Sequence, residues 1–133
     1  MAINEKIVEL KMQGNCCSQI VMQMSLDAMG KDENPDLLAA MKGLCGGIHC
    51  GKTCGALTAA VCAIYLANPE HAQELAEELL DWFEDVFGET DCSALLDENP
   101  ANKAERCPIF MDSVFKKLQE LMDWDDDESR VDQ

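Results

Sequence analysis

The cysteines of this chain are the residues whose type and spacing are best suited to chemistry. The 133 residues include eight cysteines, spread over nearly the whole length. They are Cys16, Cys17, Cys45, Cys50, Cys54, Cys62, Cys92 and Cys107. Secreted domains use such numbers for disulfides, whereas proteins of a reducing compartment more often use clustered thiols to hold a metal or to carry out redox reactions. Residues 1–6 show no basic stretch followed by an apolar one, so we expect no secretory signal, a cytoplasmic location and reduced thiols.

The strongly acidic charge of the chain disfavours some classes of binding partner. The sequence has 26 acidic and 10 basic residues, a formal net charge of −16. Such a surface repels the phosphates of nucleic acids and the head groups of anionic lipids, so we expect neither nucleic acid nor a membrane as partner. The charge serves either solubility alone or docking to a redox partner protein with a basic surface. The sequence is also compatible with a homodimer.

Helical signals dominate the sequence, and no segment alternates apolar and polar residues as a half-buried strand does. Asn-Pro pairs at residues 34–35 and 68–69 supply an N-cap followed by a first-turn proline. Residues 56–67 are almost wholly apolar, which predicts a central buried helix. The last helix should begin at Pro108, after a loop over residues 97–106.

These elements predict a single all-α domain of about five to six helices around a cysteine cluster. The domain should span residues 1–124, and residues 125–133 should form an acidic C-terminal tail. No Ser-His-Asp or Cys-His arrangement is evident, so we assign no catalytic residue.

Four of the cysteines fall where the sequence predicts that a helix begins. They are Cys17, Cys54, Cys92 and Cys107. The partial positive charge of a helix N-terminus lowers the pKa of a thiol and favours the thiolate, which binds metals and attacks disulfides. We therefore expect low thiol pKa values and four thiolates directed at one point. Cys62 differs, because its place within the apolar helix predicts a buried core residue.

The segment over residues 43–55, GLCGGIHCGKTCG, is too rich in glycine for a regular element and predicts a loop. Its Cys-x4-Cys-x3-Cys spacing differs by one residue from that of plant-type ferredoxins. His49 is a possible alternative ligand, but we expect it to be exposed on the loop. Residues 46–53 match the P-loop pattern G-x-x-x-x-G-K-[ST], yet a predicted helix precedes them in place of a strand. We therefore expect no nucleotide site.

Segments around the four helix-start cysteines resemble those of a family of redox-active proteins named for a C…CGAxxG…C…C pattern. Residues 14–19, GNCCSQ, resemble the first segment, with Cys17 at the motif position. Residues 54–59, CGALTA, look like CGAxxG, residues 91–96, DCSALL, are similar to the third segment, and Cys107 supplies the fourth cysteine. The resemblance covers nearly the whole chain.

The chain departs from this family at a few positions. Ala59 replaces the last glycine of CGAxxG, and Cys16 stands where asparagine is expected. Cys45 and His49 interrupt the glycine-rich run. The frame of four cysteines is intact.

The resemblance implies a redox role, in keeping with anaerobic metabolism. Similarity to the cluster-bearing part of split-Soret cytochromes further implies an iron–sulfur cluster, with a two-iron form favoured over a four-iron form. Its ligands would be Cys17, Cys54, Cys92 and Cys107. The protein would transfer single electrons or sense redox conditions, as a carrier rather than an enzyme with its own substrate.

Two other functions fit the cysteines. A thiol–disulfide protein would cycle a pair such as Cys16 with Cys17, or Cys50 with Cys54, between dithiol and disulfide. A structural zinc site would use four cysteines to hold the fold and would do no chemistry.

Overall fold

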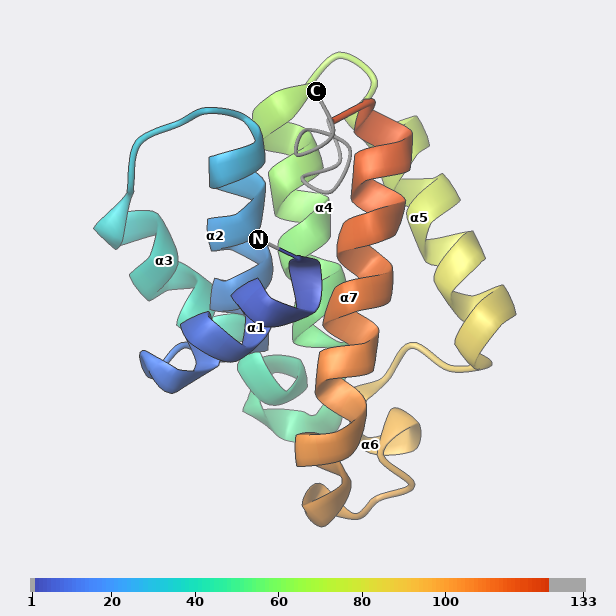
Figure 1. The fold of residues 1–133 in the computed structure, drawn as a ribbon. Coiled ribbons are helices and arrows are strands. Elements are labelled where there is room, and N and C mark those ends of the chain that lie inside the picture. Colours follow the sequence, from blue (N-terminus) through green and yellow to red (C-terminus); the bar gives the residue numbers. More distant parts are fainter. Residues whose placement is uncertain (1, 125–133) are drawn as a thin grey trace.

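The structure, a computed structural model, describes residues 2–124 and forms a bundle of helices (Figure 1). The described residues form seven α-helices, one more than the five to six predicted if the four-residue α6 is counted. They are α1 (Ile3–Met12), α2 (Cys17–Ala28), α3 (Pro35–Met41), α4 (Gly55–Ala67), α5 (Ala72–Phe87), α6 (Cys92–Leu95) and α7 (Lys103–Met122). The described residues contain no β-strand, only an isolated bridge between Thr53 and Asp91. The all-α prediction is confirmed.

Helix α4 is the centre of the bundle and packs against α2, α5 and α7 (Figure 1). Its alanines at positions 56, 59, 60 and 63 are at most 1% exposed. Such small side chains let three neighbouring helices approach while keeping a strong helix preference. Ala59 is fully buried. Its methyl group is therefore accommodated within the packed core.

The last helix begins earlier than the sequence predicted. The side chain of Asn99 accepts a hydrogen bond from the backbone N–H of Ala101 at 3.1 Å and starts the 3₁₀ turn η3 (Pro100–Asn102). This turn runs directly into α7, so the loop predicted over residues 97–106 and the start predicted at Pro108 are wrong. The start signal is a third Asn-Pro pair, at residues 99–100. Pro108 lies inside α7, where its ring nitrogen cannot donate to the carbonyl four residues earlier.

The remaining turns connect these helices at one end of the bundle. The 3₁₀ helix η1 (Lys42–Leu44) and the π-helical turn η2 (Gly47–Gly51) lie between α3 and α4. Figure 1 shows the first residues of α2, α4 and α7 and the whole of α6 at this same end. In the part of the chain that the structure describes, no helix is both long and apolar enough to cross a bilayer. The acidic tail predicted over residues 125–133 lies outside the described residues.

Candidate functional site

The four cysteines predicted to act together border one cavity. Cys17 is the first residue of α2, Cys54 directly precedes α4, Cys92 is the first residue of α6 and Cys107 lies in the second turn of α7. The cavity has a volume of about 190 Å³. Since a single water needs only roughly 10–15 Å³ of such volume, the cavity has room for a group of several atoms. All four are free thiols.

Cys17 lies directly against the start of α4. A methyl group placed on Gly55 would lie 2.8 Å from Cys17 Sγ and 2.9 Å from the carbonyl oxygen of Leu44. Only glycine therefore permits this approach without displacement. The start of α2 is fixed in turn by the Gln19 side chain, which accepts a hydrogen bond from the N–H of Cys16 at 3.0 Å.

Backbone hydrogen bonds hold the start of α6 beside the start of α4. The N–H of Cys54 donates to the carbonyl of Thr90 at 2.8 Å, and the N–H of Cys92 donates to the carbonyl of Lys52 at 2.6 Å. The hydroxyl of Ser93 adds a bond to the carbonyl of Gly51 at 2.9 Å. The short antiparallel contact thus brings Cys54 and Cys92 together although they are far apart in sequence.

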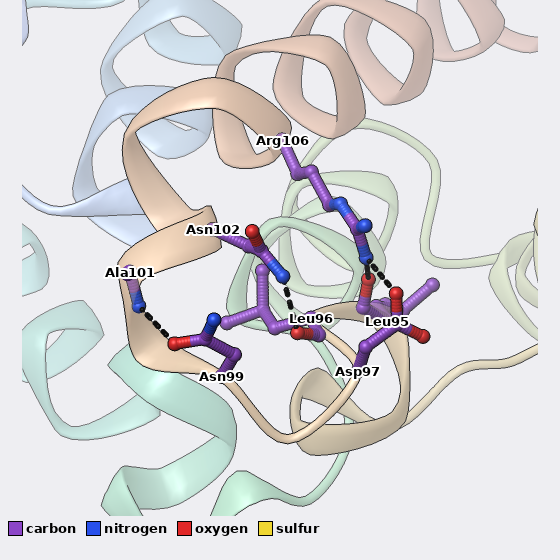
Figure 2. A network of polar contacts seen from close by, with 7 residues as sticks. All are labelled: Leu95, Leu96, Asp97, Asn99, Ala101, Asn102 and Arg106. Carbon is purple, nitrogen blue, oxygen red and sulfur yellow. Dashed lines mark hydrogen bonds and ion pairs between the residues drawn. The ribbon is translucent and has the colours of Figure 1, made fainter.

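Polar side chains tie α6 to the first turn of α7, just before Cys107 (Figure 2). Arg106 Nη1 donates to the carbonyl of Leu95 at 2.9 Å and pairs with the carboxylate of Asp97 at 2.8 Å. The side-chain amide of Asn102 donates to the carbonyl of Leu96 at 2.8 Å. These contacts satisfy the carbonyls at the end of α6 and fix the position of Cys92 relative to α7.

Burial, not the helix start, dominates the pKa values of Cys17 and Cys54. It raises the pKa of Cys54 to about 12, against the smaller opposing effect of the backbone N–H groups of Leu57 and Ala56. It also raises the pKa of Cys17, although the N–H groups of Gly46 and Ser18 face that sulfur. The expectation of low thiol pKa values is therefore wrong for these two cysteines. The helix-start effect is present but smaller than the cost of removing a thiolate from water.

Cys107 also departs from the prediction, because it lies inside α7 and not at its start. Burial raises its pKa to about 11, and the neighbouring thiols of Cys17 and Cys92 act in the same direction. Lys103 and Lys11 oppose this rise. As free thiols, these buried cysteines are protonated at neutral pH.

The charge around the cavity is opposite in sign to that of the whole chain. Lys11 and Lys103 line the cavity, and no Asp or Glu of the described residues does so. The net charge of the sequence is −16. The site is thus a local cationic region suited to thiolates or to another anionic group.

Two further cysteines at the cavity form a disulfide that the sequence did not predict. Cys16 and Cys45 are bonded, with Cα atoms 6.3 Å apart, and both line the cavity. The predicted reduced state is therefore wrong for these two residues, and Cys17, Cys50 and Cys54 remain free. The pairings of Cys16 with Cys17 and of Cys50 with Cys54 are not the ones that form. The sequence held one indication of this disulfide, because Cys16 and Cys45 are the two cysteines at positions where the resemblance did not lead us to expect one.

The other candidate residues lie away from the cavity. Cys50 and His49 are exposed, and a ring nitrogen of His49 lies 3.1 Å from the carbonyl oxygen of Lys42. Cys62 is half-buried against the core, slightly less buried than predicted, and does not line the cavity. The loop resembling a P-loop follows the helices α3 and η1, so it lacks the preceding strand that nucleotide binding requires.

The sequence of this chain matches the model of one known protein family. Residues 15–121 match the model of the family described as "Putative redox-active protein (C_GCAxxG_C_C)". The chain belongs to this family. No curated protein and no solved structure matches the chain significantly.

The matched range contains all four cysteines that line the cavity as free thiols. The family description gives the order GCAxxG, with glycine before the cysteine, whereas this chain has Thr53 before Cys54 and Gly55 after it. The CGAxxG order is therefore a feature of this chain. Gly55 after the cysteine is the residue that contacts Cys17 Sγ.

Proposed function

We propose that this redox-active protein binds an iron–sulfur cluster through Cys17, Cys54, Cys92 and Cys107, and that it transfers single electrons or senses redox conditions. The observation that supports this most directly is that these four cysteines, which come from four different segments of the chain, line one cavity as free thiols. A two-iron cluster is favoured over a four-iron cluster.

The residues present fit such a group by their chemistry. Four cysteine thiolates are the usual ligand set of both two-iron and four-iron clusters. The cavity volume of about 190 Å³, the two lysines and the absence of acidic lining residues among those described suit an anionic group of several atoms. Backbone N–H groups that face the sulfurs of Cys17 and Cys54 would act as outer-shell donors.

A structural zinc ion is supported less well. A tetrahedral zinc site holds each sulfur about 2.3 Å from one centre, so all four sulfurs must be within about 4.6 Å of one another. Among the described residues, no three His, Cys, Asp or Glu side chains are grouped so as to hold one metal ion.

The chain's own residues would prepare the site for this group. The cysteines must each lose a proton to bind, which burial opposes. Lys11 and Lys103 at the cavity favour the deprotonated state of Cys107. The apolar side chains of Ile20, Phe110 and Met111 line the cavity and limit the access of water. When bound, the cluster would supply one-electron oxidation and reduction.

The net charge of −16 supports a redox partner protein with a basic docking surface. In this function the protein acts in the cytoplasm as a carrier, with no nucleic acid or membrane as partner. Association that weakens steeply with added salt is the expected behaviour of such a pair. Equal rates of electron transfer at low and high salt would contradict this docking mode.

Anaerobic purification tests the cluster itself. We expect a brown protein with visible absorption and with iron and acid-labile sulfide in equal amounts, at the two-iron ratio per chain. A colourless protein that contains zinc would support the structural site. A colourless protein without any metal would overturn both metal hypotheses.

A further inference from the structure

The disulfide between Cys16 and Cys45 lies at the edge of the four-thiol cavity. The two residues are 29 positions apart in sequence and join the start of α2 to the turn that follows η1. Both line the cavity, yet neither is among the four cysteines proposed as cluster ligands. The proposed cluster therefore leaves this pair without a function.

The two sulfurs of this disulfide differ in access to solvent. Cys16 is half-buried at the N-cap of α2, whereas Cys45 is only 7% exposed. Thiol–disulfide exchange begins with an attack by a thiolate on a sulfur that it can reach. Attack from solvent is therefore directed at Cys16, and Cys45 becomes the leaving group.

A buried hydroxyl faces the leaving sulfur. Ser18 is fully buried, and its Oγ lies 2.8 Å from Cys45 Sγ and donates to the carbonyl of Met41 at 2.6 Å. A disulfide sulfur has no proton to donate, but the thiol formed by reduction can donate to the free lone pairs of this hydroxyl. The reduced form thus has a hydrogen-bond partner for a buried S–H group, which lowers the cost of opening the disulfide.

We propose that Cys16–Cys45 is an exchangeable disulfide, a second redox centre beside the four-thiol site, and that it reacts with a dithiol. One thiolate of the dithiol attacks Cys16 Sγ, the Cys16–Cys45 bond breaks, and Cys45 takes the electron pair and a proton. The second thiolate of the dithiol then attacks the mixed disulfide. This step releases Cys16 as a thiol and the dithiol as its own disulfide. Two electrons and two protons pass from the dithiol to the protein.

This centre would differ in kind from the proposed cluster. The disulfide exchanges electrons in pairs through covalent chemistry at Cys16, whereas a cluster passes them singly. The inference does not require a cluster to be bound. In a reducing compartment, the disulfides that do form are mostly transient ones with a catalytic or sensing role.

Peptide mapping of the unsubstituted protein tests the proposal. Trypsin cuts after Lys11, Lys31, Lys42 and Lys52, so Cys16 lies in peptide 12–31 and Cys45 in peptide 43–52. The oxidised native protein should give these two peptides linked. After treatment of the native protein with dithiothreitol and blocking of the free thiols, the link should be lost. A link that resists dithiothreitol until the protein is unfolded, or no link at all, would overturn the proposal.

Single variants identify the two sulfurs. Cys16→Ser and Cys45→Ser should each lose the linked pair. Cys17→Ser and Cys50→Ser are matched controls in the same two peptides, and both should retain it. Loss of the link in either control would contradict the assignment. The unsubstituted protein gives the main result even if a variant does not fold.

Capture of glutathione tests which sulfur is attacked. With oxidised glutathione, the thiol of Cys16 in the Cys45→Ser variant should form the mixed disulfide several-fold faster than the thiol of Cys45 in Cys16→Ser. Equal rates would overturn the role of Cys16 as the attacked sulfur. Iron and sulfide are measured on the same samples. Iron-loaded protein with an inert link would contradict this inference alone, and iron-free protein with an exchangeable link would contradict the proposed cluster alone.

Discussion

The start and the middle of α4 place a cysteine in very different surroundings. Cys54 directly precedes the helix, borders the cavity and lies beside Gly55, which Cys17 Sγ contacts. Cys62 lies about two turns further on, against the hydrophobic core and away from the cavity. The comparison shows that the role of a thiol in this protein follows from the irregular segments around it and not from the helix that bears it.

Replacing each of the two cysteines in turn tests most directly whether their roles differ. Cys54→Ser should abolish iron binding, because three thiolates leave one iron open to solvent, and should destabilise the loaded protein. Cys62→Ala should leave the iron content unchanged and should cost at most about 1 kcal/mol, as small core truncations do. Anaerobic iron and sulfide analysis of both variants beside the parent gives the answer. Equal loss of iron in the two would show that their surroundings do not separate their roles.

The contact between Gly55 and Cys17 offers a second test at the cavity end of α4. Gly55→Ala should destabilise the protein by about 1–3 kcal/mol, since the new methyl group must displace the Cys17 sulfur or the Leu44 carbonyl. Gly43→Ala is the matched control, because a methyl group there meets nothing within 4 Å. It should be neutral or stabilising by less than about 1 kcal/mol. Urea unfolding measures both, and similar effects of the two would refute the close approach.

The raised thiol pKa values predict a loss of stability in base. The pKa of Cys54 is about 12 in the folded protein and 9.0 without burial, so the folded state keeps its proton over this interval. Stability is then complete below about pH 9 and falls as the pH rises toward about pH 12. Urea unfolding of the metal-free protein should show a decrease on the order of 1 kcal/mol between about pH 8 and about pH 10. Cys54→Ser should reduce this decrease, and Cys50→Ser, at an exposed position, should retain it.

The smallest effect is expected where α6 meets α7. Arg106→Gln removes the ion pair with Asp97 and the bond to the Leu95 carbonyl, which should cost about 1 kcal/mol. Cys92 should also become faster to alkylate in the metal-free protein, because α6 is held less firmly. Lys116→Gln breaks an ion pair with Asp112 that lies within α7 and does not involve α6, so it should change neither quantity by a measurable amount. An unchanged alkylation rate in Arg106→Gln would show that Arg106 does not position Cys92.

The helices and the thiols of the cavity were predictable to different degrees. The apolar run of residues 56–67 and the Asn-Pro pair at residues 34–35 predicted α4 and α3 because both signals are local. The Asn-Pro pair at residues 99–100 is a local signal of the same kind and begins the η3 turn that leads into α7. The true start of α7 is therefore contained in the sequence, ahead of the predicted start at Pro108.

The remaining features depend on contacts between distant segments. No local pattern predicts that the N–H of Cys92 will bond the carbonyl of Lys52, or that Cys45 will reach Cys16. The thiol pKa values could not be predicted for the same reason. The helix start lies next to the cysteine in sequence, but the side chains that bury Cys54 come from other helices.

The backbone contact between the segments before α4 and α6 has a consequence for evolution. Its two bonds use the N–H groups of Cys54 and Cys92 and the carbonyls of Lys52 and Thr90. Any residue supplies a carbonyl, so positions 52 and 90 are free to drift without loss of these bonds. Gly55 is constrained in a different way, because a side chain there would collide with the sulfur of Cys17. In this chain the contact therefore limits the sequence at one position through space and leaves its two carbonyl positions free to accept most side chains.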